Sequence, residues 1–167
     1  LGSMKLNINS KIDCVLKAIF GSEENKDVLI HLLNAVLNPP PEAQITGVKI
    51  MNPFNERTFD EGKLSVVDIK AEDQIGRHFQ IEMQIQIHPG LKERMLWTWA
   101  SLYHRHLEKG HDYRELTPTI AIWFVDEDLF PSVDAFHHQF GVLERERHEL
   151  LCDDLDLRIV EMQKWGS

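Results

Sequence analysis

Two runs of alternating side chains within residues 64–87 constrain the fold of this chain more than any other feature. In the first run, apolar and polar residues alternate from Val67 to Glu72, and in the second they alternate from Phe79 to Ile87. A period of two is typical of β-strands that bury one face more than the other. The short polar segment between the runs predicts that they form a β-hairpin.

The turn of this hairpin sets which residues face each other. If residues 74–76 form a three-residue loop, Gly76 takes the left-handed conformation that such loops require. Asp68 then lies directly opposite Glu82, with Gln84 one step further along the same face. The same register gathers the apolar residues of both arms on the other face, so the apolar pattern favours it.

Two carboxylates directly across a sheet repel each other. A proton or a divalent cation can compensate for that repulsion, in which case the acids form a site. The alternative is that both acids lie on a solvated face near lysine and arginine and have no chemical role. Three polar groups in fixed register, Asp68, Glu82 and Gln84, favour the site.

Size and charge narrow the class of protein. Residues 1–3 resemble the remnant of an expression tag, and residues 4–167 have the length of a single domain. The formal charge of −9 argues against a broad, nonspecific coat for nucleic acid, although it leaves room for a local basic groove or for an acidic metal site. Two cysteines, no signal segment and no membrane-spanning apolar run predict a cytoplasmic protein without a disulfide framework.

The remaining segments predict an α/β fold. Helices are expected over 10–20, where Asp13 lies, over 22–37 and over 91–109. A strand is expected over 45–51, a polar connection over 52–62, and a strand covered on both faces over 117–125, followed by strands over 136–143 and 155–162.

This order resembles the PD-(D/E)XK nuclease superfamily, and within it the branch of nuclease-family transposases, or recombination-promoting nucleases. The matching pieces are DCVLKAIFG with the later LLNAVLN, the SVVD strand, the EMQ strand, ERMLWTWASLYHRHLEKGHDYRELTP and TIAIWF. They cover roughly residues 10 to 125. The resemblance implies a restriction-endonuclease-like core, in which a central mixed β-sheet of αβββαβ order is flanked by helices.

The resemblance also implies a Mg²⁺-dependent DNA endonuclease, with Mn²⁺ as a substitute, linked to recombination or transposition. Asp68 and Glu82 would bind the metal together with the backbone carbonyl of Met83, and Asp13 would support the site. Gln84 stands where the superfamily usually has lysine, and Val67 replaces the proline before the aspartate. The residues expected to contact the DNA backbone lie on the helix that follows, and they are Arg94, Lys92 and Arg105.

Two alternatives stay open at this stage. The neutral Gln84 and the charge of −9 are compatible with a nuclease-like fold that binds DNA or a protein but no longer cuts. The second alternative is an assembly domain that dimerises through strand edges or through a Trp-rich helix. A homodimer is also compatible with a nuclease. No organic cofactor and no membrane partner are expected. The family's longer members imply a C-terminal region that this sequence lacks.

Overall fold

The computed structural model describes residues 18–52, 66–84 and 89–165. Its first elements follow the predicted order of helix, three strands, helix and strand, and two more strands follow. The short 3₁₀ turns are η1 (Glu23–Asn25), η2 (Pro41–Ala43), η4 (Tyr113–Glu115) and η5 (Met162–Lys164). The helices and strands are α2 (Lys26–Leu37), β1 (Val48–Ile50), β2 (Val66–Asp73), β3 (His78–Gln84), α3 (Leu91–Arg105), β4 (Thr119–Val125), β5 (His137–Phe140) and β6 (Leu155–Glu161).

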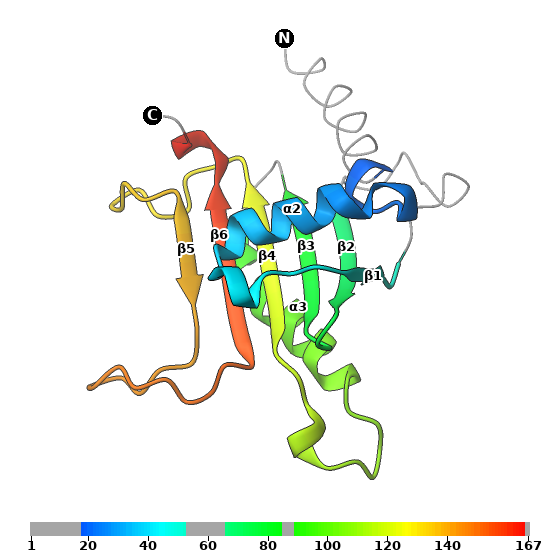
Figure 1. The fold of residues 1–167 in the computed structure, drawn as a ribbon. Helices are drawn as coiled ribbons and strands as arrows, with labels where there is room; N and C mark the ends of the chain where they lie inside the picture. Colours follow the sequence, from blue (N-terminus) through cyan, green and yellow to red (C-terminus); the bar gives the residue numbers. More distant parts are fainter. Residues whose placement is uncertain (1–17, 53–65, 85–88, 166–167) are drawn as a thin grey trace.

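The strands form one six-stranded mixed sheet in the order β1-β2-β3-β4-β6-β5 (Figure 1). The first three strands are antiparallel neighbours, whereas β3, β4 and β6 are parallel to one another and β5 runs antiparallel to β6 at the edge. Parallel neighbours need a crossover connection, and α3 provides it between β3 and β4. The predicted α/β fold with a central mixed sheet is confirmed.

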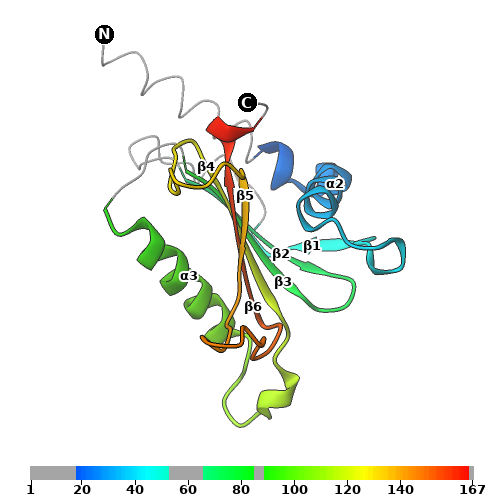
Figure 2. The same ribbon diagram turned by 90° about the vertical axis from the view of Figure 1, so that its left-hand side faces the viewer.

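Helices α2 and α3 cover opposite faces of the sheet (Figure 2). Side chains of a strand alternate between the two faces, so β3 contributes to both layers. Phe79 and Ile81 pack in the cluster that contains Leu29 and Leu33 of α2. On the other face, the buried Met95 of α3 packs in a second cluster with Trp123 of β4. The polar residues of β3 therefore face the layer of α3.

The hairpin between β2 and β3 has the predicted three-residue loop. Gly76 has a φ of +84°, and the backbone N–H of Asp73 donates to the carbonyl of Arg77 at 3.0 Å. The Asp73 carboxylate closes the turn, because it accepts from the backbone N–H groups of Ile75 and Arg77 at 3.1 and 2.9 Å and from Arg77 Nε at 2.7 Å. The register places Asp68 opposite Glu82, as predicted.

Several predicted element ends differ from the observed ones. Helix α3 ends at Arg105 rather than at residue 109, because His106 leaves the helix and its ring stacks on that of His78 at a centroid distance of 3.4 Å. The strand expected over 45–51 shortens to β1, because the backbone of Ile45 bonds to a side chain instead of a strand. Asn34 Oδ1 accepts from the Ile45 N–H at 2.8 Å, and Asn34 Nδ2 donates to the Ile45 carbonyl at 2.9 Å. The strand expected over 136–143 ends at Phe140.

Parts of three predictions lie outside the described residues. They concern most of the first helix, including Asp13, the polar connection after Asn52, and the end of the second alternating run from residue 85 to Ile87. Among the helices that are described, none has both the length and the apolar character needed to cross a bilayer.

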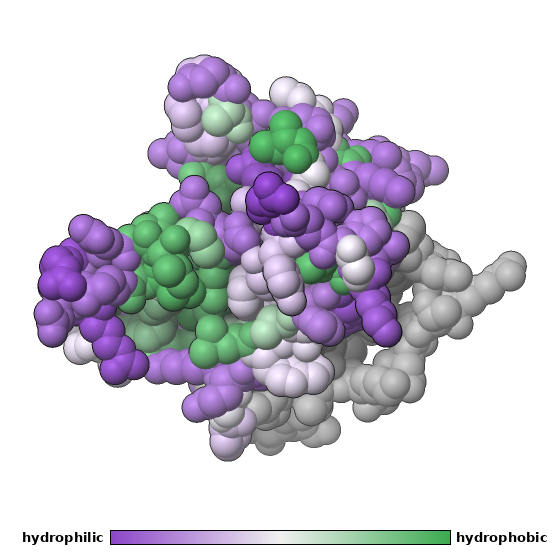
Figure 3. All heavy atoms as spheres, turned by 90° about the horizontal axis from the view of Figure 1, so that it is seen from below, coloured by the Kyte–Doolittle hydropathy of each residue, from purple (hydrophilic) through white to green (hydrophobic). Residues whose placement is uncertain are grey.

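The connection between β5 and β6 carries exposed apolar side chains beside a charged tip. Figure 3 shows this apolar area next to the hydrophilic tip when the molecule is viewed from below. The exposed apolar residues of this end are Phe140, Val142, Leu143, Leu150 and Leu151. Strand β5, next to this apolar area, is an edge strand of the sheet, and exposed edge strands can pair with other chains. The homodimer expected from the sequence stays a prediction.

We expect Asp73→Ala to destabilise the protein, because it removes three hydrogen bonds from a turn whose carboxylate is buried. The loss should be about 2–4 kcal/mol of unfolding free energy, at roughly 1 kcal/mol for each bond plus the cost of the donors left unpaired. Urea unfolding measures it. Asp134→Ala, at an exposed position, is the control and should change the unfolding free energy by less than about 0.5 kcal/mol. Equal losses in the two variants would contradict this account of the turn.

Candidate functional site

Asp68 on β2 and Glu82 on β3 face each other directly across the two strands. The backbone shows that they form a non-hydrogen-bonded pair. Asn52 Nδ2 donates to the Asp68 carbonyl at 3.0 Å, and Asn52 Oδ1 accepts from the Lys70 N–H at 2.6 Å. Backbone groups of Asp68 and Lys70 thus point away from β3. In such pairs the Cα atoms are only about 4.5 Å apart and the side chains are close.

Glu82 is largely removed from solvent, the Asp68 side chain is 32% exposed, and each acid has one buried oxygen without a donor among the described residues. Glu82 is 3% exposed. Asp68 Oδ1 and Glu82 Oε2 are buried and accept no hydrogen bond from any residue in the described part of the chain. The same holds for Oε1 of Gln80, which lies two residues before Glu82 on the same face. A buried acceptor without a donor costs about 1–3 kcal/mol, so this group of oxygens favours a cation or bound water.

The environment of Glu82 raises the pKa of its carboxyl group to about 7. Burial is the main cause, because it disfavours the charged form, and the negative charge of Asp68 adds to it. The guanidinium of Arg94, a hydrogen bond from Gln80 and the ammonium of Lys70 act in the opposite direction. Glu82 is therefore close to half protonated at neutral pH, and a cation could replace that proton.

Three side chains from three different elements surround the acids. Gln80 Nε2 donates to Glu82 Oε1 at 2.7 Å, which orients this carboxylate. Lys70 Nζ lies 3.3 Å from Asp68 Oδ2. Arg94, near the start of α3, holds its guanidinium 5.8 Å from the ring centroid of Trp123, the β4 neighbour of Glu82 in the parallel register.

Gln84 and Met83 occupy the end of β3. Gln84 is 3% exposed and lies on the same face as Glu82, as predicted, while its backbone carbonyl accepts from the N–H of Asp126 after β4 at 3.2 Å. Met83 pairs with Val67, and the alternation of the ladder makes this a hydrogen-bonded pair. One lone pair of the Met83 carbonyl is thus directed at β2, and its role as a metal ligand stays a prediction.

The other predicted DNA contacts are spread along α3. Lys92 Nζ lies 4.6 Å from the ring centroid of Phe130, and no contact between Lys92 and either acid is seen among the described residues. Arg105 is at the far end of the helix, where its Nε donates to the Ser101 carbonyl at 3.1 Å. At about 1.5 Å of rise per residue, Arg105 is roughly 16 Å from Arg94 along the axis. Arg94 is the predicted DNA contact that lies beside the acids.

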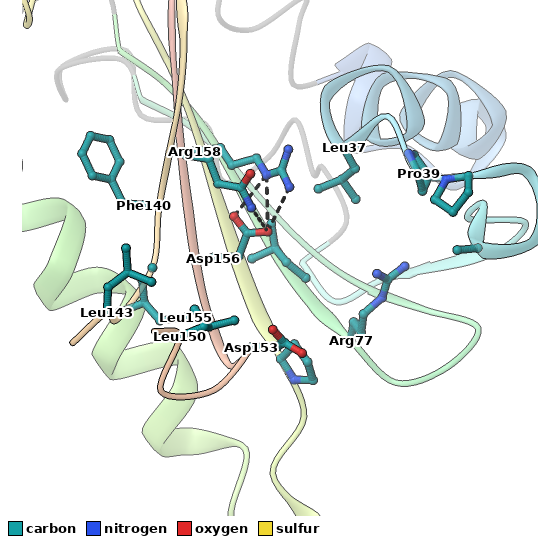
Figure 4. Close-up of a pocket in the computed structure, with 16 residues that line it drawn as sticks. Leu37, Pro39, Arg77, Phe140, Leu143, Leu150, Asp153, Leu155, Asp156 and Arg158 are labelled. Carbon is teal, nitrogen blue, oxygen red and sulfur yellow. Dashed lines mark hydrogen bonds and ion pairs between the residues drawn. The ribbon is translucent and has the colours of Figure 1, made fainter. Parts of the chain in front are cut away.

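A pocket of about 640 Å³ lies elsewhere, at the end of α2 and the start of β4 and β6 (Figure 4). Its main cations already have partners. The guanidinium of Arg158 binds Asp156 and donates to the Val36 carbonyl at 3.1 Å, while that of Arg77 binds Asp73. The carboxylates of the candidate site do not line this pocket. It therefore does not extend the candidate site.

The donor set of the candidate site fits a hard divalent cation. In the described residues, no group of three or more His, Cys, Asp or Glu side chains is arranged to hold a metal ion. Mg²⁺, however, is commonly bound by one or two carboxylates and completes its coordination with water. Asp68 and Glu82 supply two carboxylates with buried, donor-free oxygens, so the residues present are suited to such an ion.

Taken together, a mixed sheet between two helices and a pair of acids on adjacent antiparallel strands define a nuclease-type α/β domain. The chain belongs to the PD-(D/E)XK nuclease family transposases, whose family model matches residues 10–167. This family consists of nucleases, hydrolases that act on nucleic acid, and PD-(D/E)XK nucleases generally use divalent metal ions. Comparisons with curated proteins and with solved structures give no match.

Sequence reasoning missed three residues that shape the site, Asn52, Lys70 and Gln80. Lys70 and Gln80 share the period-two face of Asp68 and Glu82, so that pattern could have indicated them. Asn52 falls where a loop was expected, and nothing in the sequence pattern shows that its side chain continues the strand pairing.

We expect Glu82→Gln to stabilise the protein at pH 8, measured with a chelator present. The folded pKa of Glu82 is near 7 and its ordinary value is 4.5, so the folded state binds more protons between these values and stability falls as pH rises. The variant removes this loss, which amounts to about 3 kcal/mol at most. The difference should vanish near pH 4.5 in urea unfolding.

Glu161→Gln is the matched control, because Glu161 is equally buried but accepts bonds from Leu129 N–H and Lys164 Nζ at 2.8 and 3.1 Å. It should destabilise the protein at pH 8. A Glu82→Gln variant less stable than the wild type at pH 8 would contradict the assignment of a costly, unpaired charge.

Proposed function

We propose that this protein is a metal-dependent endonuclease that hydrolyses phosphodiester bonds in DNA, in a process of recombination or transposition. The observation that carries the proposal is the close pair of carboxylates on β2 and β3, each with a buried oxygen that has no donor among the described residues. Membership of a nuclease family of transposases supports it. Asp68 and Glu82 would hold Mg²⁺, and Mn²⁺ would substitute.

The chemistry follows from the residue types. A bound divalent ion supplies Lewis acidity that polarises the scissile phosphate and lowers the pKa of an attacking water. The water oxygen bonds to phosphorus as the bond to the leaving oxygen breaks; the water loses a proton and the leaving oxygen gains one. The products are one phosphate monoester end and one hydroxyl end. Gln80 keeps the Glu82 carboxylate oriented throughout.

The remaining predicted residues have supporting roles in this proposal. The amide of Gln84 is placed on the face of the acids, where it can hydrogen-bond the attacking water. Arg94 contacts the DNA backbone beside the site, and Lys92 and Arg105 extend this contact along α3. Asp13 and the Met83 carbonyl complete the proposed set.

A second candidate is a nuclease-like domain that binds DNA or a protein without cutting. The observation that favours it is the neutral Gln84 two residues after Glu82, where the wider PD-(D/E)XK superfamily usually has lysine. The two candidates differ in whether metal binding and cleavage depend on the acids.

We expect the purified protein to nick supercoiled plasmid in the presence of Mg²⁺ or Mn²⁺. Asp68→Asn and Glu82→Gln should each lower the rate by at least about 100-fold, because each removes a ligand on which charge stabilisation depends. Asp134→Asn, at an exposed position, should cut like the wild type. Wild-type protein that does not cut, or acid variants that cut normally, would remove the endonuclease proposal.

Mn²⁺ calorimetry should show an affinity that increases with pH up to about 7. Below the pKa of Glu82 the ion must displace a proton, so affinity should rise by up to about tenfold per pH unit. In Glu82→Gln this dependence should disappear along with most of the affinity. If the protein is instead a non-cutting scaffold without a metal site, neither the wild type nor Glu82→Gln should bind Mn²⁺.

A further inference from the structure

Lys70 is a cation of the hairpin itself, and its ammonium contacts one of the paired acids, Asp68. It follows Asp68 by two residues on β2, so both side chains project from the same face. Its Nζ is 3.3 Å from Asp68 Oδ2, and its β3 neighbour is Gln80, which binds Glu82. The ammonium therefore belongs to the same polar group as both carboxylates.

The backbone of Lys70 is held on two sides. Its N–H donates to Asn52 Oδ1 at 2.6 Å, and its carbonyl accepts from the N–H of Met51 at 2.7 Å. The flanking residue Ile69 is 1% exposed and packs in the core on the opposite face. These bonds fix the position of the Lys70 backbone relative to the acids, so that the ammonium stays within reach of a phosphate bound beside them.

Phosphoryl transfer needs positive charge directed at the oxygens where negative charge develops. The superfamily motif (D/E)XK has lysine two residues after the second acid, and this chain has the neutral Gln84 there. Lys70 stands on the other side of the Asp68–Glu82 pair, on the neighbouring strand, and its own side chain is 29% exposed. It is thus buried enough to be effective and open enough to meet a substrate.

We propose that Lys70 is the catalytic cation of this site, in place of a lysine at position 84. On substrate binding, its ammonium exchanges the Asp68 carboxylate for a nonbridging oxygen of the scissile phosphate and stabilises the charge that develops there. This inference rests on the proposed endonuclease function and adds the residue that supplies the positive charge.

Arg94 is the competing cation, and its placement is less suited to this role. It comes from α3 rather than from the hairpin, its side chain is exposed, and its guanidinium lies over Trp123. It is placed to hold the DNA backbone at the edge of the site. Loss of Arg94 should therefore raise KM more than it lowers kcat.

The test compares Mg²⁺-dependent plasmid cleavage by the wild type, Lys70→Met, Lys70→Arg and Arg94→Gln. Lys70→Met should lower kcat by at least about 100-fold, the usual effect of removing one group that stabilises a developing oxyanion. Lys70→Arg should retain more activity than Lys70→Met, because it keeps the charge. Lys49→Met is the matched control, since this lysine lies exposed on the adjacent strand β1 opposite Glu72, and it should cut like the wild type.

Two further measurements distinguish the loss of the Lys70 charge from a structural effect of the substitution. Mn²⁺ calorimetry of Lys70→Met should show an affinity equal to or higher than that of the wild type, because a competing cation has left Asp68. The double variant Lys70→Met/Gln84→Lys should regain part of the lost kcat, since it moves the ammonium to the other side of the acids. If Lys70→Met does not fold, Lys70→Gln serves the same comparison with a polar side chain.

The outcomes are distinct. A wild type that does not cut removes the proposed function, and this inference with it. A wild type that cuts while Lys70→Met stays within about threefold of it, a change too small for a lost charge contact, removes this inference alone. The same holds if Lys70→Met no longer binds Mn²⁺, or if Arg94→Gln, not Lys70→Met, loses kcat.

Discussion

Close approach of two carboxylates, the half-buried Asp68 and the buried Glu82, is the interaction on which the rest of the site depends. It is unfavourable in the free protein, since burial and mutual repulsion raise the pKa of Glu82 to about 7. The fold maintains it by fixing the backbone on both sides. The Asp73 turn sets the register of the hairpin, and Asn52 completes the outer edge of β2. The core around Phe79 and Ile81 then prevents the strands from slipping.

The two faces of the hairpin separate the stabilising apolar groups from the polar groups of the candidate site. Odd-numbered residues of β3 enter the apolar layer beneath α2, and even-numbered ones, Gln80, Glu82 and Gln84, enter the layer of α3. The sheet can therefore tolerate an energetically costly face, because the other face is filled with well-packed apolar side chains. A strand between two layers can thus contribute to the core with one set of residues and present the polar groups of the candidate site with the other.

The sequence allowed prediction of the features that depend on local pattern. Period two and a glycine at the correct position were sufficient for the hairpin register, and the apolar run of β4 for a strand buried on both faces. Features that depend on tertiary contact were not predictable. Helix α3 ends early because His106 stacks on His78, a contact across the fold. The position of Asn52 against β2 is likewise a property of the assembled sheet.

The pocket between α2 and the starts of β4 and β6 has a practical consequence for ligand discovery. It lies against the α2 layer, where the Arg158 side chain reaches the Val36 carbonyl, whereas the paired acids face α3. A small molecule that fills this hollow would leave the paired acids uncovered. Compounds selected for tight binding there should therefore be screened as stabilisers or tracers of the folded chain rather than as ligands that block the paired acids.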